Sequence, residues 1–584
     1  MHWPGSERIS DLGLVICKPF GYEALCAHRS LRAFAQAAAE SGIPTLSFDY
    51  LGTGDSADID ADADQIERWC EDVVCAVGEL RRRTGVRRVC LLGFRLGALL
   101  ASLAARRTTV DALILVAPVV RGRLYARELR TTEAMAMRAG PKTAANDTSR
   151  GSASDGSMEV GGYYLSAQTI ARLGQIDLAA LGTPPVAALL VIDRIGLPEA
   201  RAWAQSLSGC VTQLDYLALS GFVEMMMTPP PFTRIPQAMI GSVKEWLVHL
   251  ASSSTNLPAS GFGTAYPAVA PRMVLTLASS GTSPDSLPSE WPARFGPDGA
   301  LFGIVTEPHD TLRRAAIVLV NAGADSHVCV GRLYVELARQ WAESGYVVLR
   351  MDLAGLGDSH ARPGRPDNEV YPPAAVDDIR AAIAFMRSRF GVDDVTLGGL
   401  CSGAYHTLRA AVEAVPLNRI FLVNPQVFFW REGTSLEDIQ MPEIMSAESV
   451  YGERMCSFKY WKKLLTGQVD VGHIARVYQR RVMFGLATRL RDAARHLRIR
   501  LPNDLGWELE QIARRGVRIT IVFARGEPGL ELLQRQGGSS VKRLGNRCRL
   551  HIIDGADHTF SRRASRPALE MVLREALAER LPAA

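Results

Sequence analysis

The sequence lacks several features that would narrow its function at once. Its 10 cysteines form no CxxC pair and no spacing typical of a zinc site. No apolar run reaches the roughly 18 residues that a membrane-spanning helix requires, and the first residues lack the basic and then apolar stretches of a secretory signal. We therefore expect a cytoplasmic protein with reduced cysteines, no bound metal and no membrane span.

A strong charge of one sign is missing as well. The 66 Lys and Arg residues nearly balance the 61 Asp and Glu residues, which leaves a formal charge of +5 over 584 residues. A nucleic-acid-binding protein needs a concentrated basic surface, so this composition argues against a nucleic-acid partner. The hydrophobic share of 47% is that of a globular protein. The length exceeds what one core usually supports, so we expect two large domains.

What the sequence does contain is an internal repeat. Residues 42–56, GIPTLSFDYLGTGDS, match residues 345–359, GYVVLRMDLAGLGDS, at an offset of 303 positions. Residues 86–105, VRRVCLLGFRLGALLASLAA, match residues 392–411, VDDVTLGGLCSGAYHTLRAA, at an offset of 306. Each copy reads as helix, strand and loop, and later as strand, Gly-x-X-x-Gly turn and helix. This alternation predicts parallel sheets flanked by helices.

The repeat and the composition together predict the domain organisation. Each of two tandem α/β units is expected to carry a cap insertion above its sheet, and the Ser-, Pro- and Gly-rich stretch between the units is expected to be a linker. The predicted ranges are 1–255 for the first domain (cap at about 121–180), 256–290 for the linker, and 291–584 for the second domain (cap at about 431–505).

On these motifs both units resemble the α/β-hydrolase superfamily, in which a sharp strand-to-helix turn, the nucleophile elbow, exposes the attacking side chain. The second unit resembles the serine-aminopeptidase-like branch, with LVNAG (319–323) as an oxyanion loop and GLCSG (399–403) where GxSxG would stand. The resemblance implies mostly parallel sheets with flanking helices. It departs from the common pattern at Cys401, which replaces serine, as in dienelactone hydrolases and polyhydroxyalkanoate synthases.

The resemblance also implies a catalytic triad, because the superfamily order along the chain is nucleophile, acid and histidine. Cys401, Glu527 and His558 obey that order. Glu527 follows the strand-like run RITIVFA, and His558 lies in GADHTF after RLHIID, where the superfamily carries these groups. The identity of the acid stays open, because three other carboxylates lie close by: Glu531, Asp554 and Asp557.

An oxyanion hole is implied by the same resemblance. One donor would be the backbone N–H of Ser402, the residue after the nucleophile, and the second an N–H in the loop after Asn321-Ala322-Gly323, for which we take Ala324. One such donor typically contributes about 3 kcal/mol to transition-state stabilisation. The geometry of this loop therefore matters as much as the nucleophile.

The first unit resembles a degenerate copy. Its elbow GFRLG carries Arg95 at the nucleophile position, and a guanidinium stays protonated and cannot attack a carbonyl. Asp193 stands in the acid-bearing loop, but the expected histidine region at 222–236 contains no histidine. We expect Arg95 to form a structural salt bridge in preference to binding an anion. We also consider His327 and Arg332 as residues at the substrate mouth, and His406 as a packed residue.

These observations favour an acyl-transfer enzyme, a thioesterase or acyltransferase of secondary metabolism that forms an acyl-Cys401 intermediate. Its substrate would be an acyl thioester or ester, either free or carried on an acyl-carrier protein. A thioester intermediate keeps more transfer potential than an oxygen ester, which favours transfer over hydrolysis. The alternatives are a hydrolase of small esters, lactones or amides, and a non-catalytic binding or scaffold protein. No pattern indicates a nucleotide or other cofactor.

Overall fold

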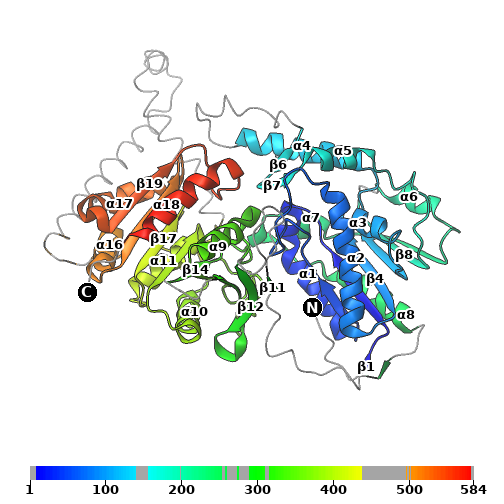
Figure 1. The fold of residues 1–584 in the computed structure, drawn as a ribbon, viewed down its shortest axis with the longest axis horizontal. Helices are drawn as coiled ribbons and strands as arrows, with labels where there is room; N and C mark the ends of the chain where they lie inside the picture. Colours follow the sequence, from blue (N-terminus) through cyan, green and yellow to red (C-terminus); the bar gives the residue numbers. More distant parts are fainter. Residues whose placement is uncertain are drawn as a thin grey trace, which may run out of the picture.

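The computed structural model describes residues 8–139, 156–196, 199–252, 288–309, 315–436 and 501–579, two short strands at 257–258 and 273–274, and single residues at 495, 497 and 499. The chain forms two α/β units, the first drawn from blue to teal and the second from green to red in Figure 1. Over the described part of the chain, no helix is both long and apolar enough to cross a membrane.

The first unit is built on a parallel sheet of six strands in the order β3-β2-β4-β5-β8-β9. The strands are β2 (Leu12–Cys17), β3 (Thr45–Ser47), β4 (Arg88–Phe94), β5 (Ala112–Val116), β8 (Ala188–Arg194) and β9 (Gln213–Leu219). The helices that cover the sheet are α1 (Tyr22–Glu40), α2 (Gln65–Thr84), α3 (Leu96–Ala104), α6 (Arg201–Ser206), α7 (Phe222–Met226) and α8 (Gln237–Ser252). Because its strands are buried on both faces, they read as continuous apolar runs.

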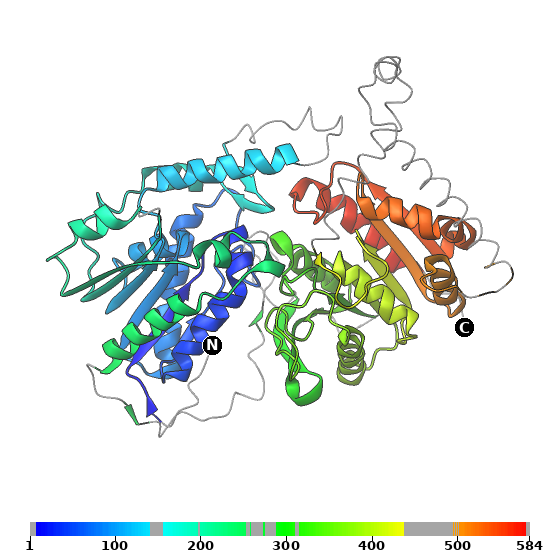
Figure 2. The same ribbon diagram turned by 180° about the vertical axis from the view of Figure 1, so that it is seen from behind.

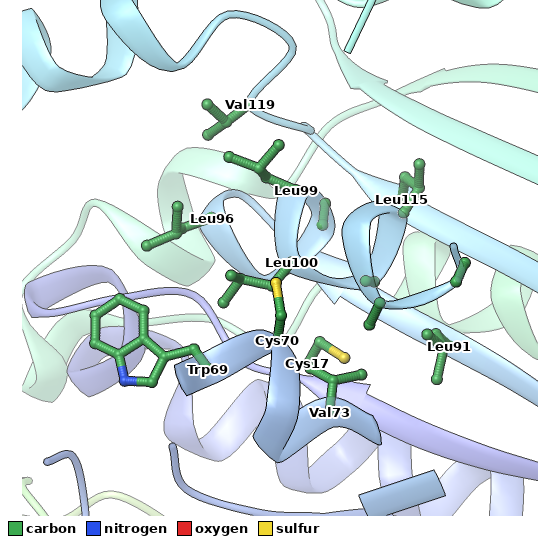
Figure 3. Close-up of a cluster of buried hydrophobic side chains, with 14 of the residues drawn as sticks. Cys17, Trp69, Cys70, Val73, Leu91, Leu96, Leu99, Leu100, Leu115 and Val119 are labelled. Carbon is green, nitrogen blue, oxygen red and sulfur yellow. The ribbon is translucent and has the colours of Figure 1, made fainter. Parts of the chain in front are cut away.

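Alternate residues of these strands enter two different cores. Leu91 and Leu115 pack with α2 and α3 on one face, while Leu92 and Ile114 pack with α1, α7 and α8 on the other. Figure 3 shows the first of these cores, where Trp69 and Cys70 of α2 lie beside residues of α3 and the sheet. Because helices cover both faces of the sheet, the part that remains accessible for a functional site is the edge formed by the carboxyl ends of the strands.

The second unit is built on a sheet of nine strands in the order β11-β12-β13-β15-β14-β16-β17-β18-β19. The strands are β11 (Met273–Val274), β12 (Ser289–Phe295), β13 (Leu301–Glu307), β14 (Ala316–Val320), β15 (Val347–Asp352), β16 (Val395–Leu400), β17 (Arg419–Val423), β18 (Arg518–Ala524) and β19 (Cys548–Ile553). Its helices are α9 (Leu333–Glu343), α10 (Ala375–Phe390), α11 (Ser402–Val412), α16 (Leu505–Arg514), α17 (Pro528–Leu544) and α18 (Arg566–Ala578). Strands β15 to β19 run parallel.

The predicted fold class, two tandem α/β units with mostly parallel sheets, is confirmed. The sequence reasoning missed the antiparallel strands β12 and β13, because they have no matching segment in the first unit. The range of the first cap holds α4 (Gly122–Ala139), β6 (Met158–Val160), β7 (Tyr163–Leu165) and α5 (Ala167–Gln175). The second cap lies mostly outside the described residues, as does most of the linker, so the domain boundary stays a prediction.

The two units meet through equivalent parts of the repeat. Arg32 of α1 donates to the carbonyl of Gly357, which lies 2.5 Å away in the GLGDS turn of the second unit. Arg332, just before α9, donates to the carbonyl of Ser56, which lies 2.7 Å away in the GTGDS turn of the first unit. Figures 1 and 2 show α1 next to the second unit from both sides. The junction is therefore pseudo-symmetric, as an isologous dimer contact would be.

The junction contains a buried carboxyl group, Asp325, that makes stability depend on pH. Burial raises its pKa from 3.8 to about 7, although His28 acts in the opposite direction. The neutral form is favoured in the folded chain, so this contribution to stability is present below pH 3.8 and is lost as the pH rises through about 7.

We predict that Asp325→Asn, which stays neutral, is more stable than the wild type by on the order of 2 kcal/mol at about pH 8, with little difference at about pH 4. Thermal unfolding of both proteins across this range measures the effect. Asp60→Asn, a change of the same kind at an exposed position, is the control. An equal gain at both pH values would contradict the assignment.

Candidate active site

Cys401 lies at a strained turn between β16 and α11. Its backbone has φ of 57° and ψ of −113°, a conformation that L-residues rarely adopt, and its N–H donates to the carbonyl of Val423 at 2.9 Å. The flanking glycines permit this turn: a Cβ on Gly399 would lie 2.3 Å from backbone of Gly403, and one on Gly403 would lie 2.5 Å from the Val320 oxygen. The sulfur is thereby held at the carboxyl edge of the sheet.

His558 and Glu527 come from the loops after β19 and β18, at the same edge. The Nδ1 atom of His558 lies 2.8 Å from Oε2 of Glu527. The side chain of Cys401 is also among the groups that interact with the imidazole and raise its pKa. Asn424, which follows β17, donates from Nδ2 to the carbonyl of His558 at 2.6 Å and accepts the Ala524 N–H at 2.8 Å. The structure therefore brings together all three residues of the predicted triad.

The electrostatics of the site favour a charged imidazole. Burial alone would lower the pKa of His558, but the neighbouring Cys401 and Glu527 outweigh burial and raise it to about 10. A protonated His558 donates from both ring nitrogens, one toward the sulfur and one toward the carboxylate. The arrangement is that of a thiol beside an imidazole that an acid orients.

The other carboxylates considered for the acid position have different partners. Glu531 pairs with Arg535 one helical turn along α17, and Asp554 pairs with Arg525. Asp557 accepts the N–H of Ser561 at 2.9 Å and thus stabilises the loop that follows the histidine. Among the four candidates, Glu527 is the carboxylate within hydrogen-bond distance of His558 in the described structure.

The oxyanion loop differs in one respect from the expectation. Ser402 begins α11, so its N–H points out of the helix start, as expected. Gly323, however, is the loop residue whose N–H reaches the elbow, where it donates to Oγ of Ser402 at 2.7 Å. Ala324 lines a hollow between the units with Leu25 and Gly357. The single N–H of Gly323 is thus already engaged by Ser402, so Gly323 anchors the loop to the elbow and Ala324 stays the predicted donor.

The first unit keeps the elbow but not its chemistry. Arg95 has φ of 52° and ψ of −115°, nearly the values of Cys401, and its side chain is 2% exposed. Its guanidinium donates to Glu23 at 2.8 Å and to Glu128 at 2.7 Å. These contacts bear out a structural salt bridge at Arg95.

In the first unit, the positions that correspond to the catalytic histidine and acid also make structural contacts. Phe222 follows β9 in the first unit, as the histidine loop follows β19 in the second. Its ring lies under the Arg95 guanidinium, with the Cζ atom of Arg95 5.9 Å from the ring centroid. Asp193 accepts the N–H of Ala200 at 2.8 Å and the hydroxyl of Tyr216 at 3.2 Å. These groups hold loops of the first unit together and leave no nucleophile at its elbow.

His327 and Arg332 do not border a substrate mouth but are buried at the junction. The nitrogens of His327 lie 2.8 Å from Asp352 and 2.9 Å from Asp55 of the first unit. His327, Asp352 and Asp358 have donor atoms close enough to suit a metal ion, but His28 lies 3.3 Å from Asp358, so these groups already have partners within the protein. His406 is packed, as expected, with Nε2 3.0 Å from the Val370 carbonyl.

An aromatic group beside Cys401 was missed by the sequence reasoning. Tyr371 stacks on Trp430 with ring centroids 4.3 Å apart and meets Tyr405 edge to face at 5.2 Å. Burial raises the pKa of Tyr371, and Cys401 and Tyr405 are the neighbouring groups that raise it further. These three residues follow three different strands and share no sequence pattern, so only the fold brings them together.

Comparison with known families assigns both units. The serine aminopeptidase family matches residues 27–163, and the alpha/beta hydrolase family matches residues 317–572. The chain is a tandem of two α/β-hydrolase units. The serine aminopeptidase match falls on the first unit of the tandem, whereas the motifs had suggested that branch for the second. An enzyme of the α/β-hydrolase class is the coarse functional assignment that the tandem receives.

Solved structures that resemble parts of the tandem include serine hydrolases and esterases. Est1E from Butyrivibrio proteoclasticus with bound ferulic acid is 17% identical, covers 42% of this chain and 92% of its own, and has a TM-score of 0.32. A serine hydrolase homologue from Coxiella burnetii is 15% identical, covers 50% of this chain and 97% of its own, and has a TM-score of 0.29. An esterase from Pyrococcus furiosus is 13% identical, covers 54% of this chain and 98% of its own, and has a TM-score of 0.30. At such TM-scores we base no inference on them. No curated protein matches this chain.

The Arg95 salt bridge gives a test of the first unit. Arg95→Met leaves Glu23 buried without its closest counter-charge, so we predict a loss of about 3–5 kcal/mol in the stability of this unit. Adding Glu23→Gln should restore more than half of that loss, because the two residues act as a pair. Denaturant unfolding followed by circular dichroism measures both effects. Additive losses in the double variant would speak against a pair.

Proposed function

We propose that the second unit is an acyl-transfer enzyme, a thioesterase or acyltransferase that forms a thioester on Cys401. The observation that carries the proposal is the convergence of Cys401, His558 and Glu527: His558 lies 2.8 Å from Glu527, and Cys401 is among the groups that raise the pKa of the imidazole. Acyl thioesters, free or attached to an acyl-carrier protein, and esters are the proposed donors. No nucleotide or metal cofactor enters the proposed mechanism.

The reaction follows from the positions of these groups. The sulfur of Cys401 attacks the substrate carbonyl carbon, a C–S bond forms, and the carbonyl electron pair moves to oxygen. The backbone N–H groups of Ser402 and Ala324 would stabilise that negative charge. As the tetrahedral intermediate collapses, the leaving thiolate or alkoxide takes the proton of His558, and the acyl group stays on sulfur.

The second half of the reaction transfers the acyl group. An acceptor alcohol, amine or thiol gives its proton to His558 and attacks the thioester, and the cysteine sulfur leaves as the thiolate. Glu527 stabilises the imidazolium in both halves. Water as acceptor would make the enzyme a hydrolase of small esters, lactones or amides, which is the second candidate.

The scaffold alternative predicts that the second elbow is as degenerate as the first. In the first unit the elbow side chain is a buried cation neutralised by two carboxylates. In the second unit the elbow side chain is a partly exposed thiol with a base within hydrogen-bond reach. This contrast favours chemistry at Cys401 over a purely structural role.

Acylation of the thiol is the first test. Incubation with p-nitrophenyl acetate or an acyl thioester should add one acyl group to the intact mass of the wild type, and peptide mapping should place it on Cys401. Cys401→Ala should abolish the adduct, because no other cysteine lies in an elbow. Cys75→Ala and Cys210→Ala, at exposed cysteines, are controls that should keep it. An adduct that persists in Cys401→Ala defeats the proposal.

Replacement of the acid is the second test. Glu527→Gln keeps the shape but removes the charge that holds the imidazolium, so kcat should fall on the order of 1,000-fold or more. The pKa of His558 should also fall from about 10, because Glu527 is one of the groups that raise it. The rate of acylation measured against pH reports both changes. Glu531→Gln, on the same helix, should behave as the wild type; the reverse pattern would make Glu531 the acid.

A further inference from the structure

Asp55 of the first unit reaches into the second unit behind the oxyanion loop. Its Oδ2 lies 2.9 Å from Nε2 of His327, and its Oδ1 accepts a hydrogen bond of 2.6 Å from Arg350 on β15. Arg350 is fully buried and also contacts Glu290 of β12 at 3.2 Å. The first unit therefore supplies a counter-charge to cations that the second unit buries.

The contact continues from His327 to the loop that faces the elbow. The N–H of His327 donates to Asp352 at 2.6 Å, and its Nδ1 lies 2.8 Å from the other oxygen of that carboxylate. Four residues earlier in the same loop, Gly323 donates to Oγ of Ser402 at 2.7 Å. Asn321 closes the loop by donating to the carbonyl of Asp325 at 2.9 Å. The loop is thus fixed at one end to the elbow and at the other end to Asp55.

The charge state of His327 suits this role. Burial alone would lower the pKa of His327, but Asp352 and Asp55 outweigh burial and raise it well above its ordinary value. The imidazolium donates from both nitrogens and so connects two carboxylates from different units. Removal of the Asp55 charge would leave His327 and Arg350 without one of their anions.

The pseudo-symmetric side of the junction is only partly equivalent. Asp358, the equivalent of Asp55 at the offset of 303 positions, lies 3.3 Å from His28 of the first unit. The residue equivalent to His327 is Ala24, however, and Asp49, the equivalent of Asp352, pairs with Lys18 of its own unit at 2.7 Å. Among the described residues, a histidine that lies between two carboxylates is therefore found on one side of the junction, in the oxyanion loop of the second unit.

The first unit also contacts the loop that carries the histidine. Glu159 of the β6-β7 hairpin accepts the N–H of Arg563 at 2.8 Å, and Tyr164 of the same hairpin lies under the Arg563 guanidinium. Gly162 packs against Ser561, where a Cβ would come within 3.0 Å of that side chain. The oxyanion loop and the loop that carries the histidine therefore both contact the first unit.

From this geometry we propose that Asp55 is a positioning residue for the reaction of the second unit: through His327 it holds the oxyanion loop against the elbow. The inference rests on the proposed acyl transfer at Cys401. It gives the degenerate first unit a defined role, which is to supply part of the support of an active site that it does not itself contain.

The test compares Asp55→Asn with the wild type in the full-length chain, using p-nitrophenyl acetate. We expect kcat to fall about tenfold with KM changed less than twofold, because the lost support acts on the transition state. Alkylation of Cys401 by iodoacetamide, which develops no oxyanion, should stay within twofold. Asp60→Asn, an exposed carboxylate of the same loop, is the matched control and should match the wild type.

Two further measurements separate this inference from the proposed function. Hydrogen exchange of the peptide at 321–333 should become at least fivefold faster in Asp55→Asn, whether or not Cys401 is acylated. His327→Gln should reproduce the effects of Asp55→Asn. The variant with both substitutions should lose less than a further twofold relative to either single variant. His327→Gln also serves as the test if Asp55→Asn does not fold. Unchanged loop exchange, or equal losses in acylation and alkylation, would overturn the role of Asp55. A wild type that is never acylated would overturn the proposed function instead.

Discussion

The strained turn at the end of β16 is the constraint on which the chemistry of the second unit depends. A positive φ at Cys401 is tolerated because glycines on both sides let the helix approach the strand closely. The turn directs the sulfur to the carboxyl edge of a parallel sheet, where loops from distant parts of the chain end. His558 and Glu527 meet the sulfur there because β18 and β19 run parallel to β16 in the same sheet.

The first unit shows that this strain by itself confers no chemistry. Arg95 adopts almost the same backbone angles, yet two carboxylates neutralise its side chain and Phe222 lies where a base would stand. The backbone of the elbow is thus a property of the fold, maintained because close packing of α3 on the sheet requires it. The side chains that converge on it decide whether a site exists.

The junction explains how a unit without a nucleophile remains joined to one that has it. Burying Asp55 with Arg350 and His327 has a desolvation cost, and such networks specify one arrangement of two surfaces more than they add stability. The repeated turns and helices make the junction pseudo-symmetric, since Asp358, the equivalent of Asp55, also meets a histidine of the other unit. His327, which stands where the first copy has Ala24, differs in that it lies between two carboxylates. The two copies of one fold thus differ both at the elbow and at the junction.

The sequence by itself determined the local features of this protein. The repeat predicted two α/β units, the Gly-x-X-x-Gly turns predicted both elbows, and Arg95 predicted that the first would lack a nucleophile. Each of these depends on neighbours in the chain, since glycine spacing and apolar runs act locally. The spacing of Cys401, Glu527 and His558 along the chain matched the superfamily, but four carboxylates were compatible with the acid position.

Only the tertiary structure decided which distant groups meet. It selected Glu527 by distance, brought Gly323 to the elbow, assembled Tyr371 with Trp430, and moved His327 from a supposed substrate mouth into the junction. The antiparallel edge β12-β13 was likewise invisible, because it has no counterpart in the first copy. Contacts between loops that follow different strands depend on strand order and on the docking of two units, and neither quantity is encoded in any short stretch of residues.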